Sequence, residues 1–241
     1  MEIKIIFDKD TLDKSLHTGW GVSFLVNETV LFDTGENGEW LVYNMKKLNV
    51  DFNKLSAVVI SHQHWDHTGG LKHILCSKKG LKVYGCSDFS EDLKRLVFDS
   101  AGNFIACKRV FEVLPGIFTT GEISGLYNGS EISEQALVLK TEKGISLLTG
   151  CSHPGIDRIL ELVRKDFPPG KPGNNFYAVL GGFHMPDKPR EEVLAELKKF
   201  KKMDVKKVGP THCSGERAED IFRESYRENF ISVKAGQTLQ F

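Results

Sequence analysis

Short runs rich in Val, Ile and Phe recur along the chain, and Gly, Asp or Ser closes each of them. This pattern is typical of β-strands. In the first half it predicts strands at residues 3–7, 20–26, 30–32, 57–60 and 83–85. In the second half it predicts strands at residues 110–114, 136–140, 145–148, 176–180 and 207–208.

Two segments between these strands carry apolar side chains at the spacing of a helix. The first stripe consists of Ile156, Ile159, Leu160 and Val163, and the second of Val193, Leu194, Leu197 and Phe200. Residues 99–130 are the least periodic, and we expect them to form an insertion or a lid. Strands and helices therefore alternate without a linker, which predicts one α/β domain over residues 1–241, made of two halves at roughly 1–110 and 111–241.

Composition narrows the class of protein. Of the 241 residues, 40% are hydrophobic and 27% are charged, which excludes a disordered or fibrous chain. Lys and Arg number 32, and so do Asp and Glu, so neither a nucleic-acid surface nor an electrostatic membrane anchor is expected. No uncharged apolar stretch approaches the ~18 residues that span a bilayer, and the N-terminus does not read as a signal peptide. We expect a cytoplasmic protein without a nucleic-acid or membrane partner.

The five cysteines are scattered, odd in number and without a C-x-x-C pair, so reduced thiols are expected rather than a disulfide framework.

The most informative segment is Ser-His-Gln-His-Trp-Asp-His-Thr-Gly-Gly at residues 61–70, directly after a buried strand. His62 and His64 alternate on one side of an extended chain, and Asp66 and His67 follow as the chain turns toward a helix. Imidazole and carboxylate groups suit zinc and also iron or manganese. Because one tetrahedral ion would need unusual chain curvature to take all four, these residues fit two adjacent metal ions better.

These four residues match, position for position, the H-x-H-x-D-H motif of the metallo-β-lactamase superfamily of metallohydrolases, which the chain resembles. The resemblance extends to Phe-Asp-Thr-Gly at 32–35, Leu-Leu-Thr-Gly at 147–150 and Gly-Pro-Thr-His at 209–212. It implies a four-layer αββα sandwich with metals at the sheet edges. It also implies that Asp33 orients the metal loop and that His212 is a late ligand.

The chain departs from the superfamily's pattern in its second half. Where many relatives have Thr-Gly-Asp with a bridging aspartate, this chain has Thr-Gly-Cys-Ser-His at 149–153. No other histidine lies between residues 108 and 151, so we expect His153 to supply the mid-chain ligand. Cys151, at the bridging position, is either a thiolate ligand or an inert buried thiol.

Three short segments resemble a narrower branch of the superfamily, with members similar to 7,8-dihydropterin-6-ylmethyl-4-(β-D-ribofuranosyl)aminobenzene 5′-phosphate synthase. They are Gly-Cys-Ser-His-Pro-Gly at 150–155, Gly-Gly-Phe-His at 181–184 and Thr-His-Cys-Ser-Gly at 211–215. His184 is either a substrate- or metal-facing residue or a strand-end histidine bonded to backbone. We expect Cys213 to point away from the site and Trp65 to pack beneath the ligand loop.

The resemblance implies a hydrolase, or a transferase of the pterin-synthase type, that uses a metal-bound hydroxide on a small anionic or phosphorylated substrate. One metal is expected on His62, His64 and His153, and the other on Asp66, His67 and His212. Asp66 would accept a proton or orient the hydroxide. His184 would donate a hydrogen bond to the developing oxyanion or to a phosphate oxygen.

The expected cofactors are two divalent ions, zinc first, with manganese or iron also compatible with these ligands. Two other classes stay open on the same scaffold, a redox diiron protein and a non-catalytic metal-binding module. Redox relatives usually place Glu where His64 stands and carry a flavin domain, and this chain has neither.

Overall fold

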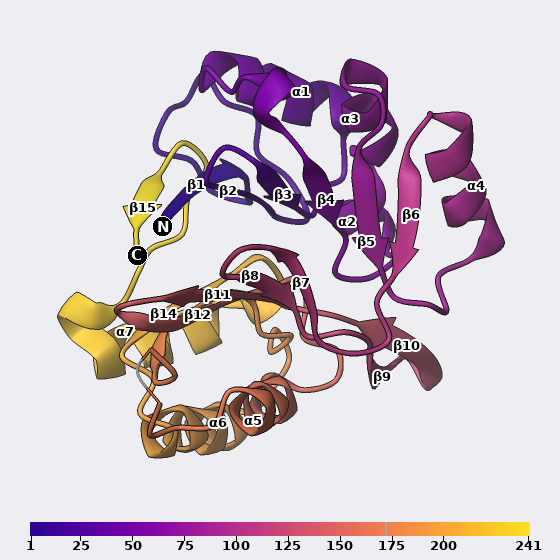
Figure 1. Ribbon diagram of the computed structural model, residues 1–241. Helices are drawn as coiled ribbons and strands as arrows, with labels where there is room; N and C mark the ends of the chain where they lie inside the picture. Colours follow the sequence, from indigo (N-terminus) through magenta and orange to yellow (C-terminus); the bar gives the residue numbers. More distant parts are fainter. Residues whose placement is uncertain (172) are drawn as a thin grey trace. The chain divides into compact units, whose positions relative to one another are not determined.

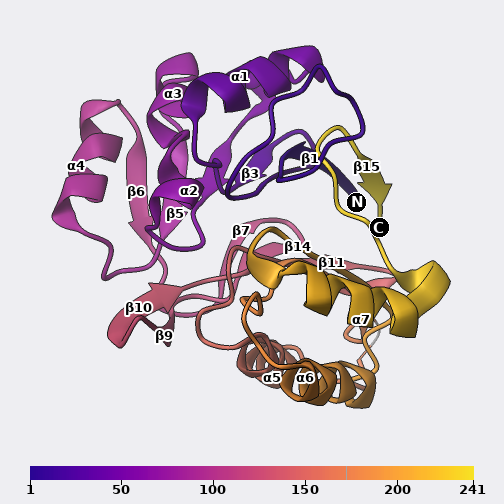
Figure 2. The ribbon, with the colours of Figure 1, turned by 180° about the vertical axis from the view of Figure 1, so that it is seen from behind.

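The structure is a computed structural model that describes residues 1–171 and 173–241. The chain folds into two compact units, Met1–Arg109 together with Lys234–Phe241, and Val110–Val233. Each unit contains a mixed β-sheet with helices packed on it (Figure 1, Figure 2). The α/β class that the alternation of strands and helices predicts is therefore observed within each unit.

The first unit is built on a seven-stranded sheet in the order β15-β1-β2-β3-β4-β5-β6. Its strands are β1 (Glu2–Phe7), β2 (Ser23–Val26), β3 (Val30–Phe32), β4 (Ala57–Val59), β5 (Lys82–Gly85), β6 (Asn103–Ala106) and β15 (Thr238–Gln240). The strands from β15 to β3 pair antiparallel, and those from β3 to β6 pair parallel. The carboxyl ends of β3, β4 and β5 therefore meet at one edge, where loops can bring polar side chains together.

Helices α1 and α3 lie beside each other on this sheet (Figure 1). The helices of the unit are α1 (Gly38–Lys47), α2 (Trp65–Thr68), α3 (Leu71–Ser77) and α4 (Glu91–Asp99), with a 3₁₀ turn at Phe52–Lys54. The side chain of Asn37 accepts hydrogen bonds from the N–H groups of Glu39 and Trp40, which satisfies two free donors at the start of α1. Leu41 and Ile74 are fully buried in the core between these helices and the sheet.

The second unit repeats this design with a six-stranded sheet in the order β14-β13-β12-β11-β8-β7, accompanied by a two-stranded sheet of β9 and β10. Its strands are β7 (Phe111–Leu114), β8 (Ile117–Thr119), β9 (Ile123–Tyr127), β10 (Ser130–Glu134), β11 (Leu137–Thr141), β12 (Gly144–Thr149), β13 (Phe176–Gly182) and β14 (Lys207–Thr211). Strands β12, β13 and β14 pair parallel, so they too end at a common edge.

Three helices cover one face of this sheet (Figure 2). They are α5 (Ile156–Asp166), α6 (Arg190–Lys202) and α7 (Glu216–Tyr226), with 3₁₀ turns at His212–Ser214 and Arg227–Asn229. The predicted apolar stripes on α5 and α6 point into the core: Ile159 and Val193 are almost completely buried. Both predicted helices are confirmed, because an apolar stripe of this width has to be covered.

Two predictions from periodicity are corrected. Residues 99–130 are not a lid: they form β6 at the edge of the first sheet, β7 and β8 of the second sheet, and β9. They lack clear periodicity because β6 and β7 are edge strands and β9 belongs to a two-stranded sheet, so these strands are only partly buried. The strand predicted from residue 20 begins only at Ser23, because Gly21 has φ +88 and its backbone lies against that of Asp66.

No helix among the described residues has both the length and the apolar composition needed to cross a bilayer.

Candidate metal centre

In the first unit, four candidate ligands follow β4 directly: His62 and His64 on the loop before α2, and Asp66 and His67 within α2. His62 and His67 are fully buried, and Asp66 is 8% exposed. His62 Nε2 lies 3.1 Å from His64 Nδ1, and His67 Nε2 lies 3.4 Å from Asp66 Oδ2. The rings of His62 and His67 are 4.2 Å apart between centroids. The loop therefore gathers three imidazoles and one carboxylate at the end of a buried strand.

Asp33 orients this loop from behind, after β3. Its Oδ2 atom lies 2.7 Å from His67 Nδ1, and its Oδ1 atom accepts a hydrogen bond from the backbone N–H of Ser61. The Ser61 hydroxyl donates to Oδ2 as well. Because a carboxylate only accepts, His67 donates from Nδ1, which leaves Nε2 as the atom that could bind a metal ion. This is the orienting role that the resemblance implies for Asp33.

Electrostatics at this pair favour a positive charge. Burial opposes the charged form of His67, but the attraction and hydrogen bond of Asp33, with a smaller contribution from Asp66, raise the pKa of His67 to about 10. Burial also raises the pKa of the Asp33 carboxyl group. A divalent ion at His67 Nε2 would supply positive charge beside this carboxyl group.

Trp65 does not pack beneath the ligand loop, which corrects the expectation from the sequence. Its side chain is 62% exposed at the start of α2. The loop is held instead by backbone contacts: the N–H and hydroxyl of Thr34 both donate to the carbonyl oxygen of His67. Close backbone approach between Gly21 and Asp66 also supports this loop.

In the second unit, the loop after β12 is organised by a buried carboxylate that sequence reasoning missed. Glu134, at the end of β10 and 1% exposed, accepts hydrogen bonds from the backbone N–H groups of Cys151, Ser152 and His153 at 2.7–2.8 Å. Its Oε2 atom also lies 2.9 Å from His153 Nδ1. Glu134 therefore orients the ring of His153, as Asp33 orients the ring of His67.

The charge of Glu134 is stabilised by these donors. Burial alone would raise its pKa, but the hydrogen bond from His153 and those from the loop backbone outweigh burial and lower the pKa of Glu134. No local sequence pattern predicts a role for Glu134, because a single Glu at the end of a strand is expected to be exposed to solvent. Only its pairing with a loop 17–19 residues further along reveals its role.

His212 and Cys151 are close neighbours in the second unit. Cys151 Sγ lies 3.3 Å from His212 Nε2, and the two residues are 4% and 5% exposed. His212 follows β14 and has φ +51, and Ser152 has φ +66. Non-glycine residues at such angles cost about 1–3 kcal/mol each and concentrate at functional sites.

Cys213 does not point away from this site, contrary to the expectation from the sequence. Its Sγ atom lies 3.6 Å from the carbonyl oxygen of Cys151. Burial would raise the pKa of the Cys213 thiol, but contacts with Cys151, His212 and His184 bring that pKa well below its usual value. Cys213 is thus part of the polar cluster of the second unit.

His184 stands two residues past β13 in the same unit, also with a positive φ of +49. Its ring lies 4.7 Å from that of His153, and Tyr127 of β9 stands edge-on to both rings. The hydrogen bond with Cys213 raises the pKa of His184. On its other side His184 lines a pocket with Pro186, Asp187, Lys188, Pro189 and Glu192.

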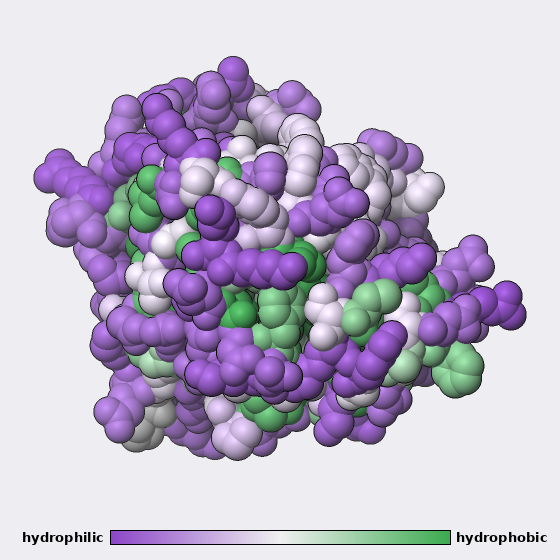
Figure 3. Space-filling view, turned by 90° about the horizontal axis from the view of Figure 1, so that it is seen from above, coloured by the Kyte–Doolittle hydropathy of each residue, from purple (hydrophilic) through white to green (hydrophobic). Residues whose placement is uncertain are grey.

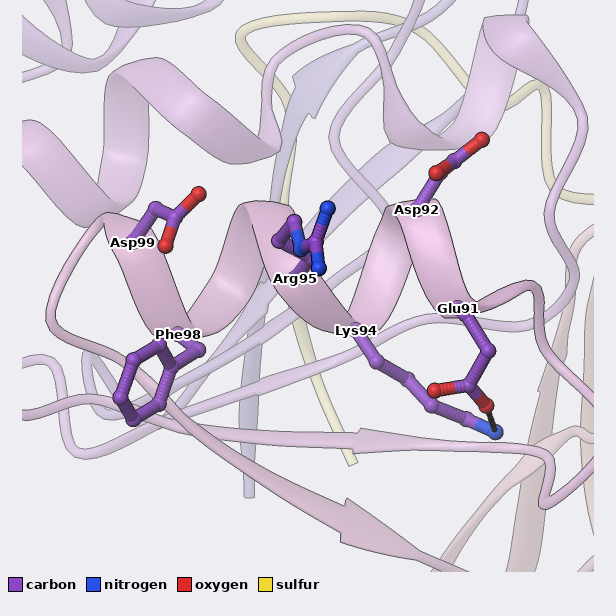
Figure 4. Close-up of a pocket in the computed structure, with 6 residues that line it drawn as sticks. All are labelled: Glu91, Asp92, Lys94, Arg95, Phe98 and Asp99. Carbon is purple, nitrogen blue, oxygen red and sulfur yellow. Dashed lines mark hydrogen bonds and ion pairs between the residues drawn. The ribbon is translucent and has the colours of Figure 1, made fainter.

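The two remaining histidines lie elsewhere. His73 is exposed on α3, and His17 stacks on Trp40. The hollow drawn in Figure 4 is lined by residues of α4 alone, including Phe98 and the ion pair of Glu91 with Lys94. One helix surface offers no convergent groups, so this hollow is not a site. The face in Figure 3 is mostly hydrophilic, with smaller hydrophobic areas among the hydrophilic side chains.

The donor chemistry of both loops fits divalent metal ions. Each loop presents buried imidazoles, and in each a carboxylate orients one ring through Nδ1 so that Nε2 could bind a metal ion. The first unit adds the carboxylate of Asp66, and the second adds the thiol of Cys151. Imidazole, carboxylate and thiolate together are the ligand types of zinc and of related borderline cations.

Comparison with known proteins defines the class. The sequence matches the metallo-beta-lactamase superfamily over residues 21–212. The chain therefore belongs to this superfamily of metal-dependent hydrolases, and the predicted fold, with two mixed sheets flanked by helices, is confirmed.

Within the superfamily, the chain is 32% identical to the 7,8-dihydropterin-6-methyl-4-(beta-D-ribofuranosyl)-aminobenzene-5'-phosphate synthase of Methanocaldococcus jannaschii, over 92% of this chain and 90% of that protein. It is 29% identical to the crystal structure of Tm1679, a metal-dependent hydrolase of the beta-lactamase superfamily, with a TM-score of 0.82 over 100% and 99% of the two chains. The metallo-beta-lactamase fold protein YhfI of Bacillus subtilis gives a TM-score of 0.67 at 15% identity over 99% of each chain, which shows the fold alone.

Proposed function

We propose that this protein is a two-metal hydrolase that acts on a small anionic or phosphorylated molecule. The observation that carries the proposal is the repeated arrangement in the two units. In each, a fully buried carboxylate holds an imidazole through Nδ1, at 2.7 Å for Asp33 with His67 and 2.9 Å for Glu134 with His153. A carboxylate behind a ligating histidine is characteristic of metal centres.

Ligands for cations are proposed in both units. The first unit offers His62, His64, Asp66 and His67, and the second offers Cys151, His153 and His212. The short distances within each unit support metal binding there: 3.4 Å between His67 Nε2 and Asp66 Oδ2 in the first, and 3.3 Å between Cys151 Sγ and His212 Nε2 in the second. When bound, such ions lower the pKa of a water molecule toward ~7 and polarise the group under attack.

The chain's own residues prepare this chemistry. Asp33 and Glu134 set the tautomers of His67 and His153, so each ring presents Nε2 without having to reorient. Asp66 is 8% exposed and keeps a carboxylate oxygen 3.4 Å from His67 Nε2, where it would accept the proton that an attacking water molecule gives up. The buried walls around His62 and His67 limit access of bulk water.

The substrate class follows from the similarity to the Methanocaldococcus protein, whose name describes the synthesis of an aromatic ribosyl 5′-phosphate. A small phosphorylated substrate is therefore proposed, and a transfer reaction of that synthase type is the second candidate. Zero formal net charge supports a small molecule over a nucleic acid.

Metal quantification with a screen of phosphomonoesters, phosphodiesters, lactones and thioesters tests this proposal. We expect about two divalent ions per chain and hydrolysis of a phosphorylated compound, with the rate of His64→Ala falling to that of the metal-free protein. His73→Ala, a change at an exposed histidine, is the matched control. Unchanged hydrolysis in His64→Ala would overturn the proposed function, and oxygen consumption with bound iron would point to the redox class instead.

A further inference from the structure

The second unit brings three metal-binding side chains together by itself. Cys151, His153 and His184 each offer one ligand atom, and these atoms all lie within 4.8 Å of one another. The sheet explains why: β12 and β13 pair in parallel, with Thr149 opposite Gly181, so the two chain segments leave the sheet at the same edge. A separation of this size suits one cation bound by all three atoms.

The backbone around His184 is built for close approach. A Cβ atom on Gly181 would lie 2.1 Å from the carbonyl oxygen of Thr149, and one on Gly182 would lie 2.3 Å from that of Gly150. Only glycine fits at these two positions, so β13 can carry His184 directly against the loop that holds Cys151 and His153. His184 itself has φ +49, a conformation that costs a non-glycine residue free energy.

The imidazole of His184 also has an unused nitrogen. Its Nδ1 atom is buried and has no hydrogen-bond partner among the residues that the structure describes. Leaving such a group unsatisfied costs about 1–3 kcal/mol. Strain and an unsatisfied nitrogen in the same residue, beside a thiol and a second imidazole, indicate that the residue is placed to bind something.

We propose that His184 is a metal ligand which, with Cys151 and His153, binds one divalent cation of the zinc or cobalt type in the second unit. One thiolate and two imidazoles are the donors that such borderline ions prefer. Cys213, whose thiol contacts His184, acts as a positioning residue for that ring. This assignment replaces the hydrogen-bonding role expected for His184, and it rests on the proposed function only in requiring that the chain binds divalent ions.

Cobalt(II) titration of the metal-free full-length protein tests the assignment, because a thiolate bound to cobalt gives a charge-transfer absorption in the near ultraviolet. His184→Asn is the main variant, since Asn tolerates a positive φ and keeps the backbone in place. His73→Asn, on the exposed face of α3, is the control. Cys151→Ser shows whether the absorption band comes from the Cys151 thiolate.

We expect the wild-type protein and His73→Asn to give the same band and the same affinity. His184→Asn should shift the band and weaken the thiolate-linked cobalt at least ~10-fold, as the loss of a ligand or of its immediate support does. Cys151→Ser should lose the band.

A matching band and affinity in His184→Asn would overturn the assignment, provided that circular dichroism shows the variant folded. If it is not folded, His184→Gly, which relieves the strain at φ +49, takes its place and is judged by the same two outcomes.

The result is independent of the hydrolysis test. Active His64→Ala with a shifted cobalt band in His184→Asn would remove only the proposed function. Inactive His64→Ala with an unchanged cobalt titration in His184→Asn would remove only the assignment of His184.

Discussion

At the scale of single residues, the candidate ligands of each unit depend on a carboxylate that would not itself need to bind a metal. Asp33 and Glu134 are fully buried, and hydrogen-bond donors rather than Lys or Arg face each carboxyl group. Asp33 accepts from Ser61 and His67, and Glu134 accepts from His153 and three backbone N–H groups. Burying an unpaired charge would be costly, so these donors are essential to the fold of the loops. Orientation of the ligands and stability of the loops therefore rest on the same contacts.

Replacing Glu134 by Gln should weaken divalent-metal binding about 10–100-fold. Each carboxylate oxygen accepts two hydrogen bonds, and the amide would place an NH₂ group against two of these donors. Isothermal titration with zinc measures the loss. Glu131→Gln, an exposed change on the same strand, should bind zinc as the wild type does, and equal affinities of the two variants would contradict the role of Glu134.

At the scale of elements, the ends of parallel strands place the chemistry. Strands β12, β13 and β14 are followed by Cys151, by His184 and by His212, and all three strands end at one edge. Glycines make this possible, because β13 must approach the loop after β12 more closely than any side chain would allow.

Gly182→Ala should cost about 1–3 kcal/mol of unfolding free energy and reduce metal binding, since its Cβ would meet Gly150 O at 2.3 Å and Cys213 Sγ at 2.6 Å. Gly80→Ala meets no atom within 4 Å, so it should lose only the ~1 kcal/mol of an unfavourable φ and bind metal normally. Urea unfolding measures the stability of both variants, and metal titration measures their affinity for the metal ion. Normal metal binding by Gly182→Ala would show that close approach at this strand end is unnecessary.

Helices α5 and α6 are linked by an ion pair whose effect depends on pH. Asp157 Oδ2 lies 2.6 Å from Lys199 Nζ; burial opposes the charge of Asp157, but Lys199 outweighs it and lowers the pKa of Asp157. Asp157→Asn should therefore cost about 0.5 kcal/mol at pH 7, because the pair is partly exposed.

The sign of the pH effect follows from the lowered pKa. The stabilisation is complete above the unfolded pKa of ~3.9 and is lost as pH falls through the lower folded value. The difference in urea midpoint between wild type and Asp157→Asn should thus shrink toward pH 3. Asp204→Asn, which breaks a more exposed pair with Lys206, serves as control and should have a smaller effect at pH 7. A difference that grew on acidification would contradict this account.

At the scale of the whole molecule, each unit has its own core and its own candidate ligands. The C-terminal strand β15 belongs to the first unit, where it pairs with β1. Cation binding at ligands held by the folded loops should therefore stabilise the native chain by mass action.

Removing metal with a chelator should lower the melting temperature, and zinc at about 100 times its dissociation constant should restore it. The expected gain is about 2.7 kcal/mol, or roughly 5–10 °C for a chain of this length. Differential scanning calorimetry measures it, with His64→Ala as the comparison, since loss of one ligand should reduce the gain. A melting temperature unaffected by chelator and by zinc would contradict metal binding in the native state.

The sequence by itself determined the α/β class, the helices at α5 and α6 and the metal loop after β4. Each of these features depends on residues that are close in the sequence. Apolar stripes recur every three or four residues, and the four candidate ligands His62, His64, Asp66 and His67 fall within six positions. Only the tertiary structure decided the role of Glu134, the inward position of Cys213 and the exposure of Trp65. Those features depend on which strand lies beside which loop, and pairing between distant segments leaves no periodic trace in the chain.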